Sequence, residues 1–405
     1  ASGVAIAAKI LDLYRRLGNE ERRAYFRFLA EELRPDATTV NAAASAYATD
    51  PGDVALARQQ RAVESPRQEY FRRLNLAPGA TGEIVGLRRD LLRLPKGDAA
   101  ALALDNDLAH LFASWFNRGF LVLRRIDWQT PAAILEKIIQ YEAVHEIQGW
   151  DDLRRRLDPS DRRCFAFFHP SLVDEPLIFV EVALTADIPS SIQSVLNEKR
   201  KTDDSDAAPT TAVFYSISNC QEGLKGISFG NFLIKQVVEE LIREVPQLKT
   251  FVTLSPVPTF ARWLDRVLAD EAGPATDADR IALQVLRDPG WLEDPEEDDG
   301  VRPVLMALAA HYFLLAKSAD GRPVDPVARF HLGNGARLER INWQGDVSEK
   351  GLREAHGLMV NYRYDLKEIE RNHEAFANDG EVIASRTVRG LLRAPAKTKG
   401  KPVSK

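Results

Sequence analysis

Cysteine is nearly absent from this sequence, whose 405 residues include only Cys164 and Cys220. Two cysteines without paired spacing make neither a disulfide framework nor a cysteine-ligated zinc site, and they fit a reducing compartment. Apolar runs of about 18 residues, the length that a membrane-spanning helix requires, are missing as well. We therefore expect a cytoplasmic protein with no disulfide bond and no membrane partner.

An excess of charge of one sign is also missing. Charged residues make up 28% of the chain, both signs are mixed along it, and the formal net charge is −5. Nucleic acids and anionic membranes attract strongly basic surfaces, so we expect neither of them as a partner. Hydrophobic residues make up 45%, an ordinary value for a globular chain. At roughly 100–200 residues per domain, the length predicts two or three domains.

Spacings typical of metal ligands are the third absence. The chain has seven histidines, and no two of them stand four residues apart, as a pair of metal ligands on one helix face would. Structural zinc sites take their ligands mainly from cysteine and histidine at short spacings. The sequence therefore predicts no metal site.

Residues 1–117 show helical periodicity and no strand-like alternation. Apolar residues such as Ala24, Phe28 and Leu33 recur at helical spacing in segments full of Arg and Glu. No group of side chains in this part suggests catalysis. We predict an all-helical domain, and its amphipathic helices, with Tyr25 and Phe26 as exposed aromatic residues, favour a role in association between copies.

Strand signals begin after residue 117. Runs of branched and aromatic residues, separated by turns, predict a hairpin followed by further strands. The predicted strands cover residues 163–169, 177–184, 211–218, 250–254, 336–343 and 358–364. Helices are predicted at 232–244 and through a segment at about 259–320. We therefore predict an α+β domain over 118–393 with a helical insertion, followed by a disordered tail at 394–405 that is rich in Lys, Pro and Ser.

A glycine-containing loop between the third of these strands and the next helix is the most informative stretch. Gly223, Gly226 and Gly230 lie there, just before a helix N-terminus. Free N–H groups at such an end attract phosphate, and glycine lets a ligand approach the backbone closely. No Gly-Lys-Ser/Thr sequence closes the loop, so it is not a Walker loop. On spacing alone, a plain glycine turn remains the alternative.

The order of elements around this loop resembles the acetyltransferase-like fold of the Gcn5-related superfamily. In that fold the corresponding loop binds the pyrophosphate of coenzyme A, and the two strands that follow splay apart to admit the pantetheine arm. Here those strands are residues 211–218 and 250–254. The resemblance implies a mixed-sheet domain that needs no metal, with coenzyme A as part of the substrate and no separate cofactor.

Further motifs resemble the malonyl-CoA decarboxylase family and follow its order from about Leu121 to Tyr364. They are Phe-Tyr-Ser-Ile-Ser at 214–218, Gly-Leu-Lys-Gly at 223–226, Phe-Leu-Ile-Lys at 232–235, Leu-Ser-Pro-Val-Pro at 254–258, Phe-His-Leu-Gly-Asn-Gly-Ala at 330–336, Arg-Ile-Asn-Trp at 340–343 and Gly-Leu-Met-Val-Asn-Tyr-Arg-Tyr at 357–364. The resemblance implies malonyl-CoA as the substrate and acetyl-CoA and carbon dioxide as products. It also implies a homo-oligomer, a dimer or tetramer, built through the helical domain.

The resemblance places the family's catalytic pair at Ser255 and His331. The binding loop maps onto Lys225, Gly226, Ile227, Ser228, Phe229, Gly230 and Asn231. From the residues alone, Ser255 ends a strand that Pro256 stops, and His331 lies at the edge of a tight turn. Either pattern by itself is more often structural than catalytic, and only the fold can bring the two residues together.

The family's reaction gives each of the pair a role. The resemblance implies that Ser255 contacts the malonyl carboxylate or carbonyl as the proton acceptor and that His331 protonates the enolate carbon. His169 and His356 are expected to be structural residues of a turn and a helix end. Two alternatives stay open: an acyl-CoA-dependent N-acyltransferase on the same fold, and a non-catalytic acyl-CoA sensor.

Overall fold

Helices form the whole first part of the described chain, as the sequence predicts. The computed structural model describes residues 2–95, 97–196, 208–227, 233–288, 290–293 and 295–393. The helices of the first part are α1 Gly3–Arg16, α2 Asn19–Glu32, α3 Ala37–Thr49, α4 Asp53–Val63, α5 Pro66–Leu74, α6 Ala80–Leu92 and α7 Ala99–Trp115. Side-chain caps fix several of their starts, as at Asp98, which accepts hydrogen bonds from the N–H groups of Ala100 and Ala101.

One expectation about this part is wrong. Phe26 is only 1% exposed, and Tyr25 is partly buried, with its hydroxyl hydrogen-bonded to that of Tyr70. Phe26 and Leu29 lie three residues apart and therefore on the same face of α2, which packs into the domain core. These aromatic residues stabilise the helical domain itself, so an interface must use other side chains.

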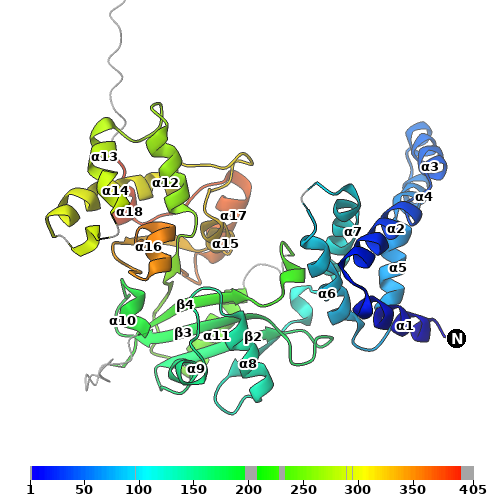
Figure 1. The fold of residues 1–405 in the computed structure, drawn as a ribbon, viewed down its shortest axis with the longest axis horizontal. Helices are drawn as coiled ribbons and strands as arrows, with labels where there is room; N and C mark the ends of the chain where they lie inside the picture. Colours follow the sequence, from blue (N-terminus) through cyan, green and yellow to red (C-terminus); the bar gives the residue numbers. More distant parts are fainter. Residues whose placement is uncertain are drawn as a thin grey trace, which may run out of the picture.

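Helices α3 and α4 form a hairpin that projects from the rest of the helical domain (Figure 1). Ala43 is the single buried residue of α3, and α4 has none among its described residues. Apolar side chains lie on this hairpin nevertheless, and Val54 is 85% exposed. A projecting apolar surface of this kind is typical of contacts with another protein.

The second part is built on one sheet, and its predicted strands are confirmed. In the described residues the strands are β1 Val122–Ile126, β2 Arg162–Phe168, β3 Pro176–Thr185, β4 Thr211–Asn219, β5 Thr250–Thr253, β6 Ser255–Pro256, β7 Arg337–Asn342 and β8 Met359–Arg363. Their order is β1-β2-β3-β4-β5-β8-β6, with β7 paired to β8. All pairs are antiparallel except β4 with β5, which run parallel because helix α11 connects them.

Helices cover both faces of this sheet (Figure 1). The apolar stripe of α11, Leu233–Glu244, packs with Phe165, Val180 and Phe214 in one cluster. The opposite face packs against α8, Ala132–Tyr141, and α9, Trp150–Leu157, through residues such as Cys164 and Phe179. Strands buried on both faces explain why β2, β3 and β4 read as continuous apolar runs rather than alternating ones.

Further helices lie between and beyond the later strands. They are α10 Ile192–Leu196, α12 Phe260–Ala269, α13 Asp277–Ala282, α14 Pro295–Leu314, α15 Pro326–Gly333, α16 Glu349–Ala355, α17 Ile369–Asp379 and α18 Arg386–Gly390, with short 3-10 turns η1 Arg118–Phe120, η2 Glu222–Leu224, η3 Leu283–Arg287 and η4 Trp291–Glu293. The helices α12–α15 form the insertion between β6 and β7. The predicted α+β class, a helical domain followed by a mixed-sheet domain with an inserted helical segment, is confirmed. The predicted tail at 394–405 lies outside the described residues.

Candidate active site

Ser255 and His331 meet inside the protein although 76 residues separate them. The Ser255 hydroxyl oxygen and His331 Nε2 are 3.2 Å apart, and the two residues are only 5% and 3% exposed. The fold therefore brings together the two residues that the sequence singled out. A hydroxyl and an imidazole at this distance form a hydrogen bond that can carry a proton.

Local structure places both residues differently from the sequence prediction. Strand β5 ends before Ser255, and Pro256 does not stop the pairing, because the two residues form β6 against Val360 and Met359 of β8. Proline lacks an N–H but is accepted at the end of such a short strand. His331 lies in the last turn of α15, not in a loop; Gly335, with φ of 80°, marks the turn that follows this helix.

Two residues that the sequence did not suggest complete the hydrogen-bond chain. The Ser255 hydroxyl donates to Oγ1 of Thr253 at 2.8 Å, and the N–H of Tyr362 donates to the same oxygen at 3.0 Å. On the other side, Nδ1 of His331 lies 2.8 Å from the hydroxyl of Tyr364. The spacing of Thr253, two residues before Ser255, was the only available signal, because strand residues two apart share a face.

The directions of these hydrogen bonds assign the histidine tautomer. Since the Ser255 hydrogen goes to Thr253, only the lone pairs of Ser255 remain for His331, and Nε2 must carry its hydrogen. Nδ1 is then the acceptor, and the Tyr364 hydroxyl donates to it. Burial lowers the pKa of His331 to about 3, because no charged partner offsets the loss of water. The free protein thus holds a neutral imidazole whose Nε2–H points at Ser255.

Aromatic packing fixes the imidazole ring. The ring of Tyr362 stacks on it with centroids 4.6 Å apart and an angle of 24° between the planes. Phe330 meets the same ring edge-on at 5.1 Å. Contacts on both sides leave the imidazole little freedom to rotate, so its nitrogen atoms stay directed at Ser255 and Tyr364.

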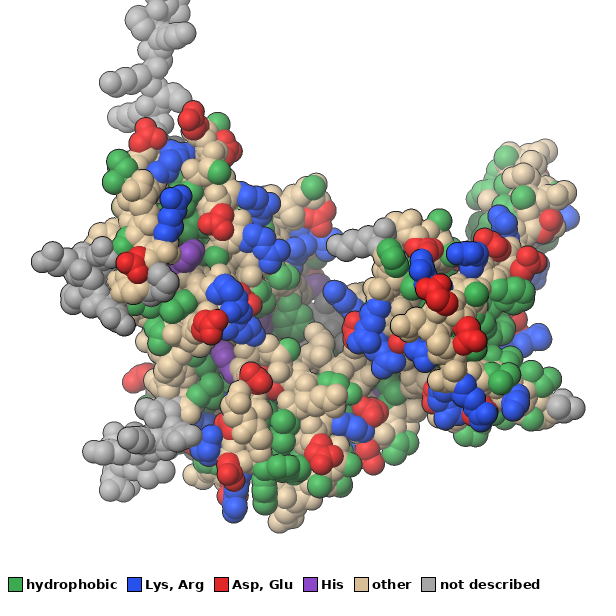
Figure 2. Space-filling model, in the orientation of Figure 1, with side chains coloured by type: hydrophobic (Ala, Val, Ile, Leu, Met, Phe, Trp, Pro, Cys, Tyr) green, Lys and Arg blue, Asp and Glu red, His purple; other side chains and the backbone are tan. Residues whose placement is uncertain are grey.

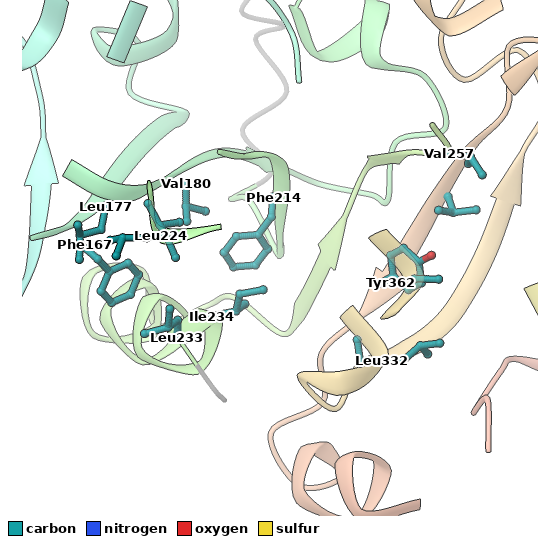
Figure 3. Close-up of a cluster of buried hydrophobic side chains, with 14 of the residues drawn as sticks. Phe167, Leu177, Val180, Phe214, Leu224, Leu233, Ile234, Val257, Leu332 and Tyr362 are labelled. Atoms are coloured by element: carbon teal, nitrogen blue, oxygen red, sulfur yellow. The ribbon is translucent and has the colours of Figure 1, made fainter. Parts of the chain in front are cut away.

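The sheet opens beside this pair. Parallel pairing of β4 with β5 ends at Phe214 and Thr253. Beyond this point β4 continues to Asn219, whereas the segment after β5 forms β6 and pairs with β8. Figure 3 shows Phe214 and Ile234 on one side of this division and Tyr362 and Leu332 on the other. The separation of β4 from β5 agrees with the splayed strands that the resemblance to the acetyltransferase-like fold implies.

A pocket leads from the glycine loop to the helix that carries His331. Its volume is about 640 Å³. Its lining residues are Tyr141, Leu177, Ile178, Asn219, Cys220, Gln221, Glu222, Leu224, Lys225, Gly226, Ile227, Leu233, Phe330 and Asn334. Figure 2 shows the surface hollowed between the helical domain and the α15–α17 region, with Lys and Arg side chains along the edge. Of the predicted loop, Lys225, Gly226 and Ile227 line the pocket, whereas Ser228, Phe229, Gly230 and Asn231 lie outside the described residues.

The other histidines that the sequence raised lie elsewhere. Nδ1 of His169 accepts the N–H of Ser171 in the turn after β2, and the ring packs on Phe116 of the helical domain. His356 is the C-cap of α16 with a left-handed backbone. His169 thus lies in a turn and His356 at a helix end, as the sequence predicts. Among the described residues, no group of three His, Cys, Asp or Glu side chains could hold a metal ion, and no helix is long and apolar enough to cross a membrane.

The fold and the site together define a class: a two-domain protein with a buried Ser–His pair beside a glycine loop and a parted sheet. Comparison with known proteins identifies it further. Residues 33–116 match the malonyl-CoA decarboxylase N-terminal domain, and residues 119–402 match the malonyl-CoA decarboxylase C-terminal domain. The chain therefore belongs to the malonyl-CoA decarboxylase family.

Similar proteins come from animals and bacteria. Mitochondrial malonyl-CoA decarboxylase of the goose Anser anser anser is 38% identical over a region covering 80% of this chain and 69% of its own length. The crystal structure of malonyl-CoA decarboxylase from Agrobacterium vitis shares 56% identity and a TM-score of 0.92, covering 97% of this chain and 96% of that one. The corresponding Rhodopseudomonas palustris structure shares 54% identity and a TM-score of 0.90, covering 96% and 94%.

Proposed function

We propose that this chain is a carboxy-lyase that binds malonyl-CoA and converts it to acetyl-CoA and carbon dioxide. The buried hydrogen bond between Ser255 and His331, at the place where β4 and β5 part, carries this conclusion. Similarity to malonyl-CoA decarboxylases along nearly the whole chain supports it, and neither alternative function gains support from the comparisons.

The pocket suggests how the substrate binds. The backbone N–H of Gly226 would help to hold the pyrophosphate, and the Lys225 side chain adds a positive charge. The apolar walls formed by Leu177, Ile178 and Leu233 suit the pantetheine arm. From there the arm would follow the gap between the strands, so that the malonyl group lies beside Ser255.

The chemistry requires a place for developing negative charge. When the bond to the carboxylate carbon breaks, its electron pair moves into the thioester, and an enolate forms as carbon dioxide leaves. A hydrogen-bond donor at the thioester oxygen stabilises that charge, and a site that excludes water strengthens the interaction. The Ser255 hydroxyl fits this role if the substrate replaces Thr253 as its acceptor.

His331 would then supply the proton. The malonyl carboxylate, bound beside the imidazole, favours the charged form of the ring, because opposite charges a few ångströms apart stabilise each other. The ring takes up a proton from water at Nδ1 on binding, delivers the proton of Nε2 to the enolate carbon, and is left neutral with its hydrogen on Nδ1. The hydrogen bond from Tyr364 to Nδ1 would break as the ring is charged and would form again once Nδ1 has lost its proton and Nε2 has regained one by exchange with water.

We also propose a homo-oligomer that forms through the helical domain, and a cytoplasmic location. The projecting α3–α4 hairpin with its exposed apolar residues supports the first. Two free, buried cysteines are consistent with a reducing compartment and support the second. The goose and mouse relatives are named as mitochondrial, so fractionation of the native cells would test the location.

One incubation tests the activity. Purified full-length protein is mixed with malonyl-CoA and EDTA, without any amine. We expect equal amounts of acetyl-CoA and carbon dioxide, because neither a metal nor an acceptor takes part. Turnover that begins only after an amine is added would show an acyltransferase, and binding without any product would show a sensor.

A further inference from the structure

A buried arginine of the helical domain holds the first half of the glycine loop. Arg88, on helix α6, donates from Nη1 to the carbonyl oxygen of Gly223 at 2.7 Å and to that of Lys225 at 3.0 Å. Hydrogen bonds from a charged donor are the stronger kind, and burial strengthens them further. A side chain of one domain thus holds two backbone groups of the other.

The guanidinium group is itself fixed from the helical side. Its Nε donates to the Asp105 carboxylate at 2.7 Å, and its carbon lies 6.0 Å from the ring centroid of Phe112. Arg88 is only 3% exposed. Both Asp105 and Phe112 belong to helix α7, so the direction of the guanidinium group is set by the packing of α6 on α7 and not by the loop.

The loop is pressed against α6 at other points too. A Cβ atom added to Gly223 would lie 2.0 Å from the carbonyl oxygen of Val85, so no other residue fits without moving the two segments apart. Beside it, Arg93, the residue that caps the C-terminus of α6, forms an ion pair with Glu222 at 2.6 Å. The contact between the α6 region and the loop is therefore close at three loop residues, Glu222, Gly223 and Lys225.

These contacts decide where one backbone donor points. In a trans peptide the carbonyl and the following N–H point in opposite directions. Because the Lys225 carbonyl points at Arg88, the N–H of Gly226 points away from the helical domain. Gly226 has φ of 79° and lines the 640 Å³ pocket, and its N–H has no partner among the described residues. A free N–H beside a pocket is what a phosphate group binds.

We propose that Arg88 is a positioning residue for coenzyme A binding, so that the helical domain forms part of the substrate site through the loop it holds. Arg88 does not touch the substrate. It fixes the peptide whose N–H group does, and this inference rests on the proposed binding of coenzyme A at the loop. The helical domain would then act on substrate affinity as well as on association.

The test compares two buried arginines of the helical domain in the full-length chain. Arg88→Met removes the hold on the loop. Arg67→Met is the matched control, because Arg67 is also buried, at 8% exposed, and bonded to a carboxylate, Asp107 at 2.6 Å, but forms none of the hydrogen bonds to the loop. Calorimetry with free coenzyme A and steady-state kinetics with malonyl-CoA are measured for both, and circular dichroism reports folding.

We expect Arg88→Met to raise the Kd for coenzyme A and the KM for malonyl-CoA at least tenfold, with kcat within about threefold of the wild type. Arg67→Met should lower the melting temperature yet leave Kd and KM unchanged. Arg88→Lys, which keeps the charge and can still bond one carbonyl, should recover part of the affinity. An unchanged Kd in folded Arg88→Met overturns the proposal, as does an equal loss in Arg67→Met.

Should Arg88→Met not fold, Asp105→Asn decides the question. It keeps the arginine but weakens its orientation, so a raised Kd supports the proposal and an unchanged Kd contradicts it. Failure of the proposed function gives a different result, since the wild-type protein itself would then bind no coenzyme A and release no carbon dioxide from malonyl-CoA.

Discussion

At the scale of single residues, the site works as a line of hydrogen bonds. Thr253, Ser255, His331 and Tyr364 follow one another at 2.8, 3.2 and 2.8 Å. A bound substrate would change both partners together, because its thioester oxygen becomes the acceptor of Ser255 and its carboxylate favours the charged form of His331. The two residues are therefore expected to act as a unit.

Single and double substitutions test that unit. We expect His331→Ala to lower kcat by about 10²–10⁴, the range typical for loss of a general acid, while the Kd for coenzyme A stays within about twofold. Ser255→Ala removes little volume and should lower kcat with little change in stability. The double variant should be much less than multiplicatively worse than either one, because the first change already disables the second residue.

Histidines outside the pair provide the controls for these kinetics. His169→Ala and His356→Ala should keep most of the activity, since His169 lies in the turn after β2, His356 caps helix α16, and neither takes part in the Ser255–His331 hydrogen bond. An inactive His356→Ala beside an active His331→Ala would contradict the assignment of the proton donor. Multiplicative losses in the double variant would instead contradict the cooperation between Ser255 and His331.

Buried neutral histidines also predict how stability depends on pH. Burial lowers the pKa of His331 to about 3 and that of His145 to about 4. Below pH 6.5 the unfolded chain binds protons that the folded chain does not, so the free energy of unfolding falls as pH falls from 6.5 toward these values. Each residue contributes about 2 kcal/mol to the loss between pH 7 and 5.

Urea denaturation at pH 7 and pH 5 measures this effect. The wild-type protein should lose stability between the two pH values, and His145→Gln should lose about 2 kcal/mol less, because a glutamine takes up no proton. His145 is a suitable choice because its imidazole takes no part in the Ser255–His331 hydrogen bond. Equal losses in the two proteins would show that the His145 imidazole is not held neutral in the fold.

At the scale of elements, the turn at Gly226 is the part of the proposed coenzyme A site that a substitution can test. Its φ of 79° lies in the left-handed region, and a Cβ atom there would meet no other atom within 4 Å. Any effect of a substitution must therefore come from the backbone conformation and not from a clash. Asparagine adopts this conformation far more readily than alanine does.

Two substitutions at Gly226 exploit this difference. Gly226→Ala disfavours the left-handed conformation by about 1–2 kcal/mol, which should weaken coenzyme A binding about 5–30-fold. Gly226→Asn has a larger side chain but should retain more of the affinity. Isothermal titration with coenzyme A measures both. If the larger asparagine binds more weakly than alanine, crowding at the pocket and not backbone conformation controls the loop.

At the scale of the whole molecule, the exposed hairpin predicts self-association. Val54 on α4 is 85% exposed, so Val54→Asp should leave the fold and the turnover of each subunit intact but lower the oligomer mass seen by light scattering. Val173→Asp, 78% exposed in a turn of the sheet domain, is the control and should not change the mass. A wild-type monomer at micromolar concentration would contradict the prediction.

Periodicity and motifs predicted much of this molecule, and the failures have physical reasons. Strands β2 to β4 were predicted because they are long, apolar and bounded by turns. Strand β6 was not, since two residues carry no periodicity and its pairing depends on β8, about 100 residues away in the sequence. Ser255 and His331 follow from the family motifs. Thr253 and Arg88 act through contacts, and Arg88 meets its partner Gly223 across 135 residues, which no local pattern reveals.

The separation of 76 positions between Ser255 and His331 also bears on how the protein folds. Loop-closure entropy grows only as the logarithm of length, about 0.6 kcal/mol for each doubling, so the inserted helices add little to the equilibrium cost of joining the pair. Contacts so distant in sequence do, however, slow folding. During refolding, helix content measured by circular dichroism should return first, and decarboxylation only after the insertion has docked and β6 has found β8.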